Sequence, residues 1–371
     1  MTSLSLFNKN TTFDGIYVVF IINRMQVLYF LLVMPGQLVD PYMIWGILAI
    51  GLLSQINLFI LSKWFASHFA EKGFQGFVEL FGSRIVRFLA VLVLILLLIK
   101  ISTLLLGVGE VVYQYIFPSM NSNWLILFIF LVCYYVAAQG VENTIRFVMI
   151  AFFSTIWMLI LFSPFFFPST ASLHNLYPLI PTEWSNHSWK GLLFIWSAFS
   201  GPEFLVFLAP WLKPQQRMLK YFSIANAISV LEYLLIFIAA LFFFGSAYLN
   251  KTKFPAVDMI RYLQSPAFER IDIILIAIHL FILVFVISFY MLFFYYTGRI
   301  VLGTRDKQAT RFGFTTSWLV MVVTAIVVNE GLWKSGEEQN LFLNLEIWSR
   351  AFTYLVVPAF LLGSTKLKER F

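Results

Sequence analysis

Long apolar stretches alternate with short polar ones along almost the whole chain of 371 residues. An α-helix needs about 20 mostly apolar residues to cross the hydrocarbon core of a bilayer. Ten windows of roughly this length occur, at about 13–34, 41–62, 85–108, 123–139, 144–167, 190–212, 221–249, 271–302, 314–333 and 344–363. The pattern therefore predicts an all-α polytopic membrane protein, in which residues 1–371 form a single transmembrane domain.

The composition supports this class. Hydrophobic residues make up 60% of the chain and charged residues 12%, and the mean hydropathy is +0.85. A soluble domain could not keep so much apolar surface from water. The net charge of +7 does not indicate a nucleic-acid partner, because the basic residues gather in loops on one side of the predicted spans. The only cysteine, Cys133, lies in an apolar run, which excludes a disulfide framework and a cysteine-based metal site.

The loop charges set an orientation. Sixteen Lys and Arg residues lie in loops on one side of the ten windows, and six lie on the other. Positively charged loops stay in the cytoplasm. We therefore expect both termini to be cytoplasmic, as an even number of spans requires.

The sixth window is interrupted at its centre, between Ser197 and Glu203. Gly201 loosens the chain there, and Pro202 removes a backbone donor and clashes with the preceding turn. Irregular backbone survives at membrane depth only where protein or a watery cavity satisfies it, and broken helices of this kind form substrate sites in transporters. We expect the break to expose carbonyls and amides that coordinate a small zwitterion, with Glu203 binding its amine.

Four ionisable residues lie at similar depth in the predicted spans: Arg24, Lys100, Glu203 and Glu232. Burying one of them alone costs about 2.5–3.5 kcal/mol or more, so pairing is expected, with Lys100 and Glu232 as a plausible couple. A structural ion pair and a functional charge, such as a proton carrier, remain equally open for these two. A functional role is favoured for Glu203, because it follows the break.

Other polar residues in or near the spans are expected to be structural. They are Glu110, the Glu269-Arg270 pair with Asp272, and Glu346 with Arg350, which are four apart on one helix and should pair with each other. The chain has neither a phosphate-binding glycine-rich loop nor histidines at metal-ligand spacing. The sequence therefore argues against an enzyme and indicates no cofactor.

Four stretches resemble the spore germination permease family, the B subunits of spore nutrient-germinant receptors within the amino acid–polyamine–organocation superfamily. They are Glu110-Val111-Val112, Gly140 to Arg146, Gly201 to Pro210, and Phe254 to Arg261 followed by Phe268 to Asp272. None is specific alone, but their order and their placement among ten spans are typical of the family. The resemblance covers nearly the whole chain.

The resemblance implies a LeuT-like fold, a five-plus-five inverted repeat in which helices 1 and 6 are broken and bind the ligand between them. The site it implies comprises Asn23, Arg24, Gln26, Leu104, Gly107, Ser197, Phe199, Ser200, Gly201, Pro202, Glu203, Ser288 and Tyr290. This sequence departs from its relatives in span 1, which has no glycine before Gly36. Either span 1 is a more continuous helix here, or side-chain donors such as Arg24 replace backbone amides.

For function, the resemblance implies a subunit that senses an amino acid or a related nutrient in the spore inner membrane and triggers germination. Its partners would be an A subunit and a C-subunit lipoprotein. The alternative is a proton-coupled amino-acid permease, in which Glu203 or Glu232 carries the proton. A structural or ion-conducting subunit with a vestigial pocket is a third hypothesis, which blockage of the pocket by Met25, Tyr29 and Phe199 would support.

Overall fold

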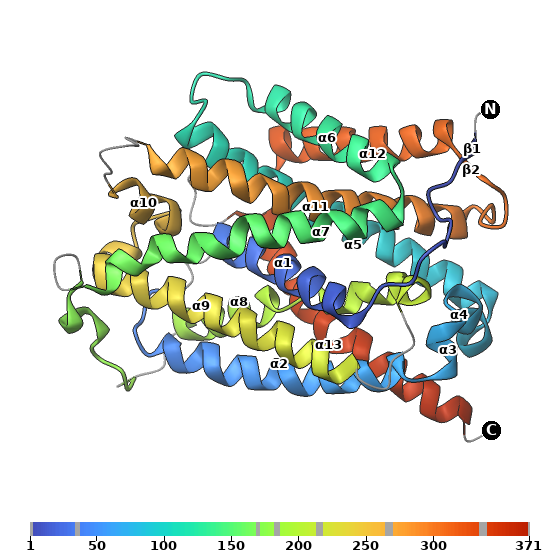
Figure 1. The fold of residues 1–371 in the computed structure, drawn as a ribbon, viewed down its shortest axis with the longest axis horizontal. Helices are drawn as coiled ribbons and strands as arrows, with labels where there is room; N and C mark the ends of the chain where they lie inside the picture. Colours follow the sequence, from blue (N-terminus) through green and yellow to red (C-terminus); the bar gives the residue numbers. More distant parts are fainter. Residues whose placement is uncertain are drawn as a thin grey trace.

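The computed structural model describes residues 3–33, 38–167, 171–181, 186–212, 218–263, 270–333 and 340–369. Gly36, Phe268 and Glu269, which the sequence analysis singled out, lie outside these residues. The described chain is almost entirely helical, and its helices lie roughly side by side in one bundle (Figure 1). The α-helices are α1 (Gly15–Val33), α2 (Met43–Phe65), α3 (His68–Glu71), α4 (Phe74–Phe81), α5 (Ser83–Tyr115), α6 (Ser122–Ala138), α7 (Val141–Ile156), α8 (Asn186–Ala198), α9 (Met218–Leu249), α10 (Pro255–Arg261), α11 (Ile271–Val301), α12 (Arg311–Gly331) and α13 (Leu341–Glu369).

Three 3₁₀ segments extend or connect these helices: η1 (Trp157–Phe166), η2 (Leu173–Leu176) and η3 (Pro202–Trp211). Among the described residues, eight helical segments are long and apolar enough to cross a membrane. They are α2, α5, α7 with η1, α8 with η3, α9, α11, α12 and α13. Two shorter apolar helices, α1 and α6, occupy the remaining two expected windows.

Helix α1 is continuous, so the expected break in span 1 is wrong. It runs from Gly15 to Val33 without glycine or proline after its first residue. Side chains from Val18 to Phe30 are all buried, as in a helix that lies inside a bundle (Figure 1). The polar residues of α1 bind its neighbours through their side chains, as described below, so the backbone need not unwind.

The break in span 6 is confirmed. Helix α8 ends at Ala198, and η3 begins at Pro202. Gly201 between them has a φ of 150°, and a Cβ built on it would lie 3.0 Å from the Cβ of Met25 in α1. Glycine is therefore needed here both for the backbone conformation and for the close approach of α1.

The N-terminal segment packs against one end of the bundle. Strand β1 (Ser3–Leu4) pairs antiparallel with β2 (Ala309–Thr310), which lies between α11 and α12. Glu142 at the start of α7 accepts hydrogen bonds from the backbone amides of Asn10 (2.5 Å) and Thr11 (2.8 Å). The Gly140 to Arg146 stretch thus anchors the N-terminal segment rather than contributing to a ligand site.

Candidate functional site

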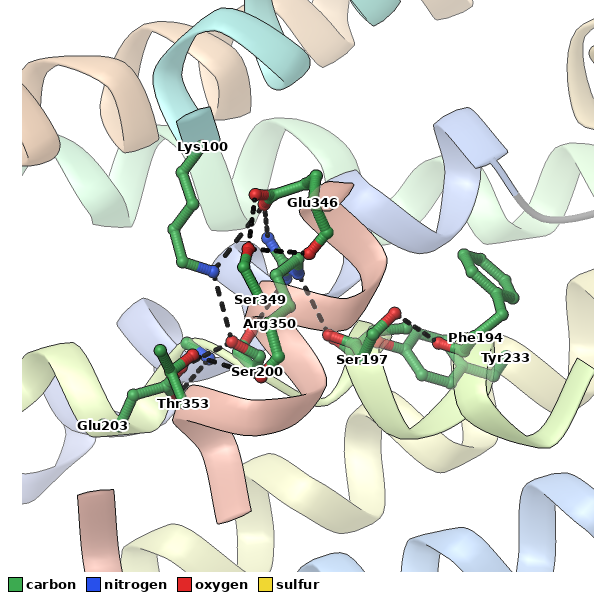
Figure 2. Close-up of polar contacts among 12 residues, drawn as sticks. Lys100, Phe194, Ser197, Ser200, Glu203, Tyr233, Glu346, Ser349, Arg350 and Thr353 are labelled. Carbon is green, nitrogen blue, oxygen red and sulfur yellow. Dashed lines mark hydrogen bonds and ion pairs between the residues drawn. The ribbon is translucent and has the colours of Figure 1, made fainter. Parts of the chain in front are cut away.

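Arg350 of α13 caps the C-terminal end of α8. Its Nε donates to the carbonyl of Ser197 (3.0 Å), and its Nη2 donates to the carbonyl of Ser200 (2.9 Å) (Figure 2). The last carbonyls of a helix lack partners within the helix and carry the negative end of its dipole, which favours a nearby cation. Arg350 therefore satisfies two carbonyls of the break and also opposes the dipole of α8.

Two more helices pair the carbonyls between these two. Tyr233 of α9 donates to Ala198 (3.1 Å), and the Gln26 amide of α1 donates to Phe199 (2.8 Å). All four carbonyls from residue 197 to residue 200 thus accept hydrogen bonds from side chains of other helices. The expectation that the break leaves carbonyls free is wrong for these four, because polar side chains had to satisfy them at membrane depth.

Glu203 caps the start of η3, on the other side of the break. Its carboxylate accepts hydrogen bonds from the Ser200 hydroxyl (2.5 Å), the Gly201 amide (2.7 Å) and the Thr353 hydroxyl (3.3 Å). Glu203 lies in the first turn of η3, where a negative charge is favourable. Arg350 and Glu203 therefore stabilise the two facing ends of the broken helix with opposite charges.

Lys100 of α5 and Glu346 of α13 complete a group of four charges, which we call the break cluster: Lys100, Glu203, Glu346 and Arg350. The Oε1 of Glu346 lies 3.7 Å from Lys100 Nζ and 3.6 Å from Arg350 Nη1. Both distances exceed normal hydrogen-bond lengths. The expected pairing of Glu346 with Arg350 is confirmed, whereas the expected Lys100–Glu232 couple is wrong.

Several buried polar atoms around the break have no hydrogen-bond partner among the described protein groups. They are Oε1 of Glu346, Nη1 of Arg350, Oε1 of Gln26 and the hydroxyl of Tyr29. The Arg350 guanidinium lies over the Tyr29 ring, 4.0 Å from its centroid. Leaving a buried polar group without a partner costs about 1–3 kcal/mol. These four atoms therefore retain unused hydrogen-bonding capacity.

Arg24 and Glu232 form a second buried group, together with Asn23 of α1 and Thr155 and Ser229 of neighbouring helices. The Nη2 of Arg24 lies 2.5 Å from Glu232 Oε1, and its Nη1 donates to Thr155 (2.6 Å). The Asn23 amide donates to Glu232 (2.6 Å) and to Ser229 (3.0 Å), while its oxygen accepts from Arg24 Nε (2.9 Å). We call this group the α1–α9 pair. Its charges bind each other and do not join the break cluster.

The other residues of the expected site lie on α5 and α11. Leu104 is buried and Gly107 partly exposed, four and seven residues beyond Lys100 on α5. The ring of Tyr290 on α11 lies 5.5 Å from that of Phe204 in η3. The hydroxyl of Ser288 donates to the Cys133 carbonyl in α6 (2.9 Å), so it is not directed at the break.

The sequence does not identify Glu346, Arg350 and Thr353 as neighbours of the break. It predicts only a local ion pair for the first two, although they lie inside a predicted span, as Arg24, Lys100, Glu203 and Glu232 do. Their spacing of four residues, with Thr353 three residues further on, places all three on one face of α13. This shared helix face is the sequence pattern that could have placed the three residues at one site.

An apolar helical bundle with one spanning helix broken at a buried charge cluster is the architecture of a membrane transporter rather than of an enzyme. The fold resembles that of a mutant manganese transporter of Eremococcus coleocola, with a TM-score of 0.53 and 14% identity over 96% of this chain and 83% of the transporter. The same transporter in complex with an aromatic bis-isothiourea substituted compound gives a TM-score of 0.51 at 13% identity, with the same coverage. These similarities establish a LeuT-like fold.

The chain belongs to the spore germination protein (Spore_permease) family, whose model matches residues 12–331. It is 31% identical over 186 residues to Spore germination protein GerQB of Bacillus cereus, an alignment that covers 48% of this chain and 49% of that protein. The matched segment thus spans about half the length of this curated relative.

Proposed function

We propose that the chain is the nutrient-sensing B subunit of a spore germinant receptor. It binds an amino acid or a related small molecule near mid-membrane, between α1 and the α8–η3 break, and triggers germination together with an A subunit and a C-subunit lipoprotein. Both termini would then lie on the cytoplasmic side of the spore inner membrane. Family membership and the similarity to GerQB support the receptor role. The observation that carries the ligand site is the group of unpartnered polar atoms around the break.

The charges of the break cluster favour a zwitterion. Lys100 and Arg350 bring two positive charges, and Glu203 and Glu346 bring two negative ones, all of them nearly inaccessible to solvent. A ligand with a net charge would leave an uncompensated charge in a low-dielectric interior. A zwitterion such as an amino acid adds one charge of each sign and keeps the cluster neutral.

The donors and acceptors of the cluster match both ends of such a ligand. Its carboxylate would lie between Lys100 Nζ and Arg350 Nη1, neither of which has a normal-length hydrogen bond in the described structure. Its ammonium group would bind the carboxylates of Glu346 and Glu203, the first of which has an unpartnered oxygen. Met25 and Gly201 hold α1 close to the break, which favours a small side chain on the ligand.

Signalling would follow from competition for Arg350. The same guanidinium binds the carbonyls of Ser197 and Ser200 and faces Glu346. A ligand carboxylate that draws it away would weaken the contact between α13 and the break. The ligand thereby favours a conformation in which α8, η3 and α13 are arranged differently, and partner subunits respond to this shift in population.

The test is binding and uptake of labelled amino acids by the purified chain in liposomes, with bound and internalised label scored separately. We expect saturable binding without accumulation. Glu203→Gln and Glu346→Gln should each weaken binding at least tenfold, while Glu110→Gln, which changes a carboxylate outside the site, should leave it unchanged. Equal binding by the wild-type protein and the three variants would refute the site.

The alternative is a proton-coupled amino-acid permease, which the similarity to a transporter fold supports. Glu232 is bound to Arg24 and Asn23, so Glu203 or Glu346 would be the better proton carrier in such a mechanism. Saturable uptake that survives without partner subunits and depends on a proton gradient would establish the permease and overturn the receptor proposal.

A further inference from the structure

A cavity of about 400 Å³ lies between α4, α5, η3, α11 and α13. Its lining is almost wholly apolar and rich in aromatic rings, among them Phe77, Phe81, Phe207 and Phe293. For scale, an apolar cavity of roughly 150 Å³ in another protein stays dry and binds benzene. This cavity is therefore suited to a hydrocarbon and unsuited to a polar solute.

The cavity adjoins the outer surface of the bundle. Four of its lining side chains are large, apolar and exposed: Leu92 (43%), Phe352 (65%), Val356 (36%) and Phe360 (45%). Leu92 lies on α5, and the two phenylalanines lie on α13, both of which are long enough to span a bilayer. In a membrane, the phase next to such side chains is the acyl-chain region, so hydrocarbon is the material available to enter.

Arginine side chains lie at one end of the cavity. The Arg305 guanidinium stacks 4.3 Å from the centroid of the Phe74 ring, and its Nε donates to the Tyr296 hydroxyl (3.0 Å). Phe74 and Tyr296 both line the cavity. Arg87 directly follows the lining residue Val86, and its Nη2 lies 3.5 Å from where a Cβ of Gly303 would be.

The acidic group that pairs with Arg305 is weakly placed to neutralise it. Asp306 lies 3.9 Å from Arg305 Nη1, and its side chain is 98% exposed. Among the described residues, Arg87 forms no ion pair. This end of the cavity therefore carries excess positive charge beside an apolar entrance, which is the combination that binds an anionic lipid headgroup.

The opposite end of the cavity reaches the break. Glu203 and Thr353 are among its lining residues, and Thr353 donates to the Glu203 carboxylate (3.3 Å). Phe204 and Phe207 of η3 form one wall, while Phe352 and Val356 of α13 form another. A molecule in the cavity would therefore contact η3 and α13, which carry three of the four charges of the break cluster.

We propose that this cavity binds one acyl chain of an anionic phospholipid, whose phosphate is held by Arg87 and Arg305. The chain extends from these arginines towards Glu203 and Thr353. Lipid tails are as apolar as the cavity wall, so preference for this site over the bulk bilayer comes from close packing and from the headgroup charges. The bound chain supports η3 against α5 and α13.

Native mass spectrometry of the chain, released from nanodiscs of phosphatidylglycerol and phosphatidylcholine, tests the proposal. We expect one phosphatidylglycerol to be retained in preference to phosphatidylcholine. The double variant Arg87→Gln/Arg305→Gln should retain it at least tenfold less well. The matched control, Lys366→Gln/Lys368→Gln, removes two exposed charges near the end of α13 and should leave retention unchanged.

A cavity-filling pair of variants separates a bound chain from a headgroup held at the surface. Ala90→Trp and the milder Val93→Phe should both reduce retention, while Val323→Phe on the exposed face of α12 should not. Loss of retention with the charge variant alone would mean that only the headgroup binds and would overturn the proposal. So would labelling of Val93→Cys by a membrane-impermeant thiol reagent, because that result would identify a water-filled passage.

Discussion

The α1–α9 pair and the break cluster are both buried and both neutral, yet they differ in how tightly their charges are held. In the α1–α9 pair, Arg24 and Glu232 meet at 2.5 Å, and each nitrogen of Arg24 has a hydrogen-bond acceptor. In the break cluster, Glu346 lies 3.6 Å and 3.7 Å from its two cationic partners and has an oxygen without a hydrogen bond. A buried ion pair whose polar atoms all have hydrogen-bond partners holds helices together. A pair with an unpartnered polar atom can still bind another polar group.

The two groups differ because one joins continuous helices and the other lies at the ends of a broken helix. The α1–α9 pair joins two helices that are continuous at the contact, so its side chains have only each other to satisfy. In the break cluster, Arg350 and Glu203 also cap the two ends of a broken helix. Arg350 uses Nε and Nη2 for the carbonyls, and only Nη1 remains to face Glu346.

Removing one charge of the α1–α9 pair should have the largest effect on stability. Glu232→Gln leaves Arg24 buried without a counter-charge, which costs about 3–5 kcal/mol. Thermal unfolding in detergent should show a large fall in Tm and a low yield of folded protein. The double variant Arg24→Met/Glu232→Leu should recover most of the loss, and a wild-type Tm for Glu232→Gln would show that the pair is not structural.

The corresponding change in the break cluster should cost less. Glu346→Gln loses no hydrogen bond at Oε1, and its amide oxygen can still accept from Ser349, which donates to Oε2 at 3.1 Å. The variant leaves the cluster with one uncompensated positive charge, but it breaks ion pairs of 3.6 Å and 3.7 Å rather than one of 2.5 Å, and Glu203 remains as a counter-charge. We expect a loss of about 2–3 kcal/mol, at the upper end of the usual range for a single substitution. Thermal unfolding beside Glu232→Gln checks the order. A loss as large as that of Glu232→Gln would erase the distinction between the two groups.

A third ion pair shows the smallest expected effect. Lys253 and Glu110 are only 2.5 Å apart, but the Lys253 side chain is 43% exposed. Exposed pairs contribute about 1 kcal/mol or less. Lys253→Gln should therefore shift Tm only slightly in the same assay. A shift approaching that of Glu232→Gln would mean that distance, rather than burial and complete hydrogen bonding, decides the strength of these pairs.

The sequence predicted the apolar helices and the break because both depend on local signals. The apolar windows correspond in order to the helices, and Gly201-Pro202 interrupts the sixth at the expected place. The pairing of charges was harder, because membrane depth does not say which helices are neighbours or which way a side chain faces. Lys100 and Glu232 lie at similar depth, yet their partners are Glu346 and Arg24.

Two features of the site could not be predicted from single helices. The continuity of α1 depends on Asn23, Arg24 and Gln26 finding partners on α7, on α9 and at the α8–η3 break, which only the packed bundle provides. The pairing of the four carbonyls at the break likewise depends on α13, α9 and α1 together. A sequence pattern could identify these polar residues but not assign their partners.

The separation of Arg24 and Glu232 along the chain has a consequence for biosynthesis. The two residues are 208 positions apart, so Arg24 is made long before its counter-charge exists. At about 5–20 residues per second, the delay is at least ~10 s. An arginine at the centre of a helix costs about 2.5–3.5 kcal/mol to place in lipid. Helix α1 is thus costly to place alone in the bilayer, and its stable burial waits for α9, which is made much later.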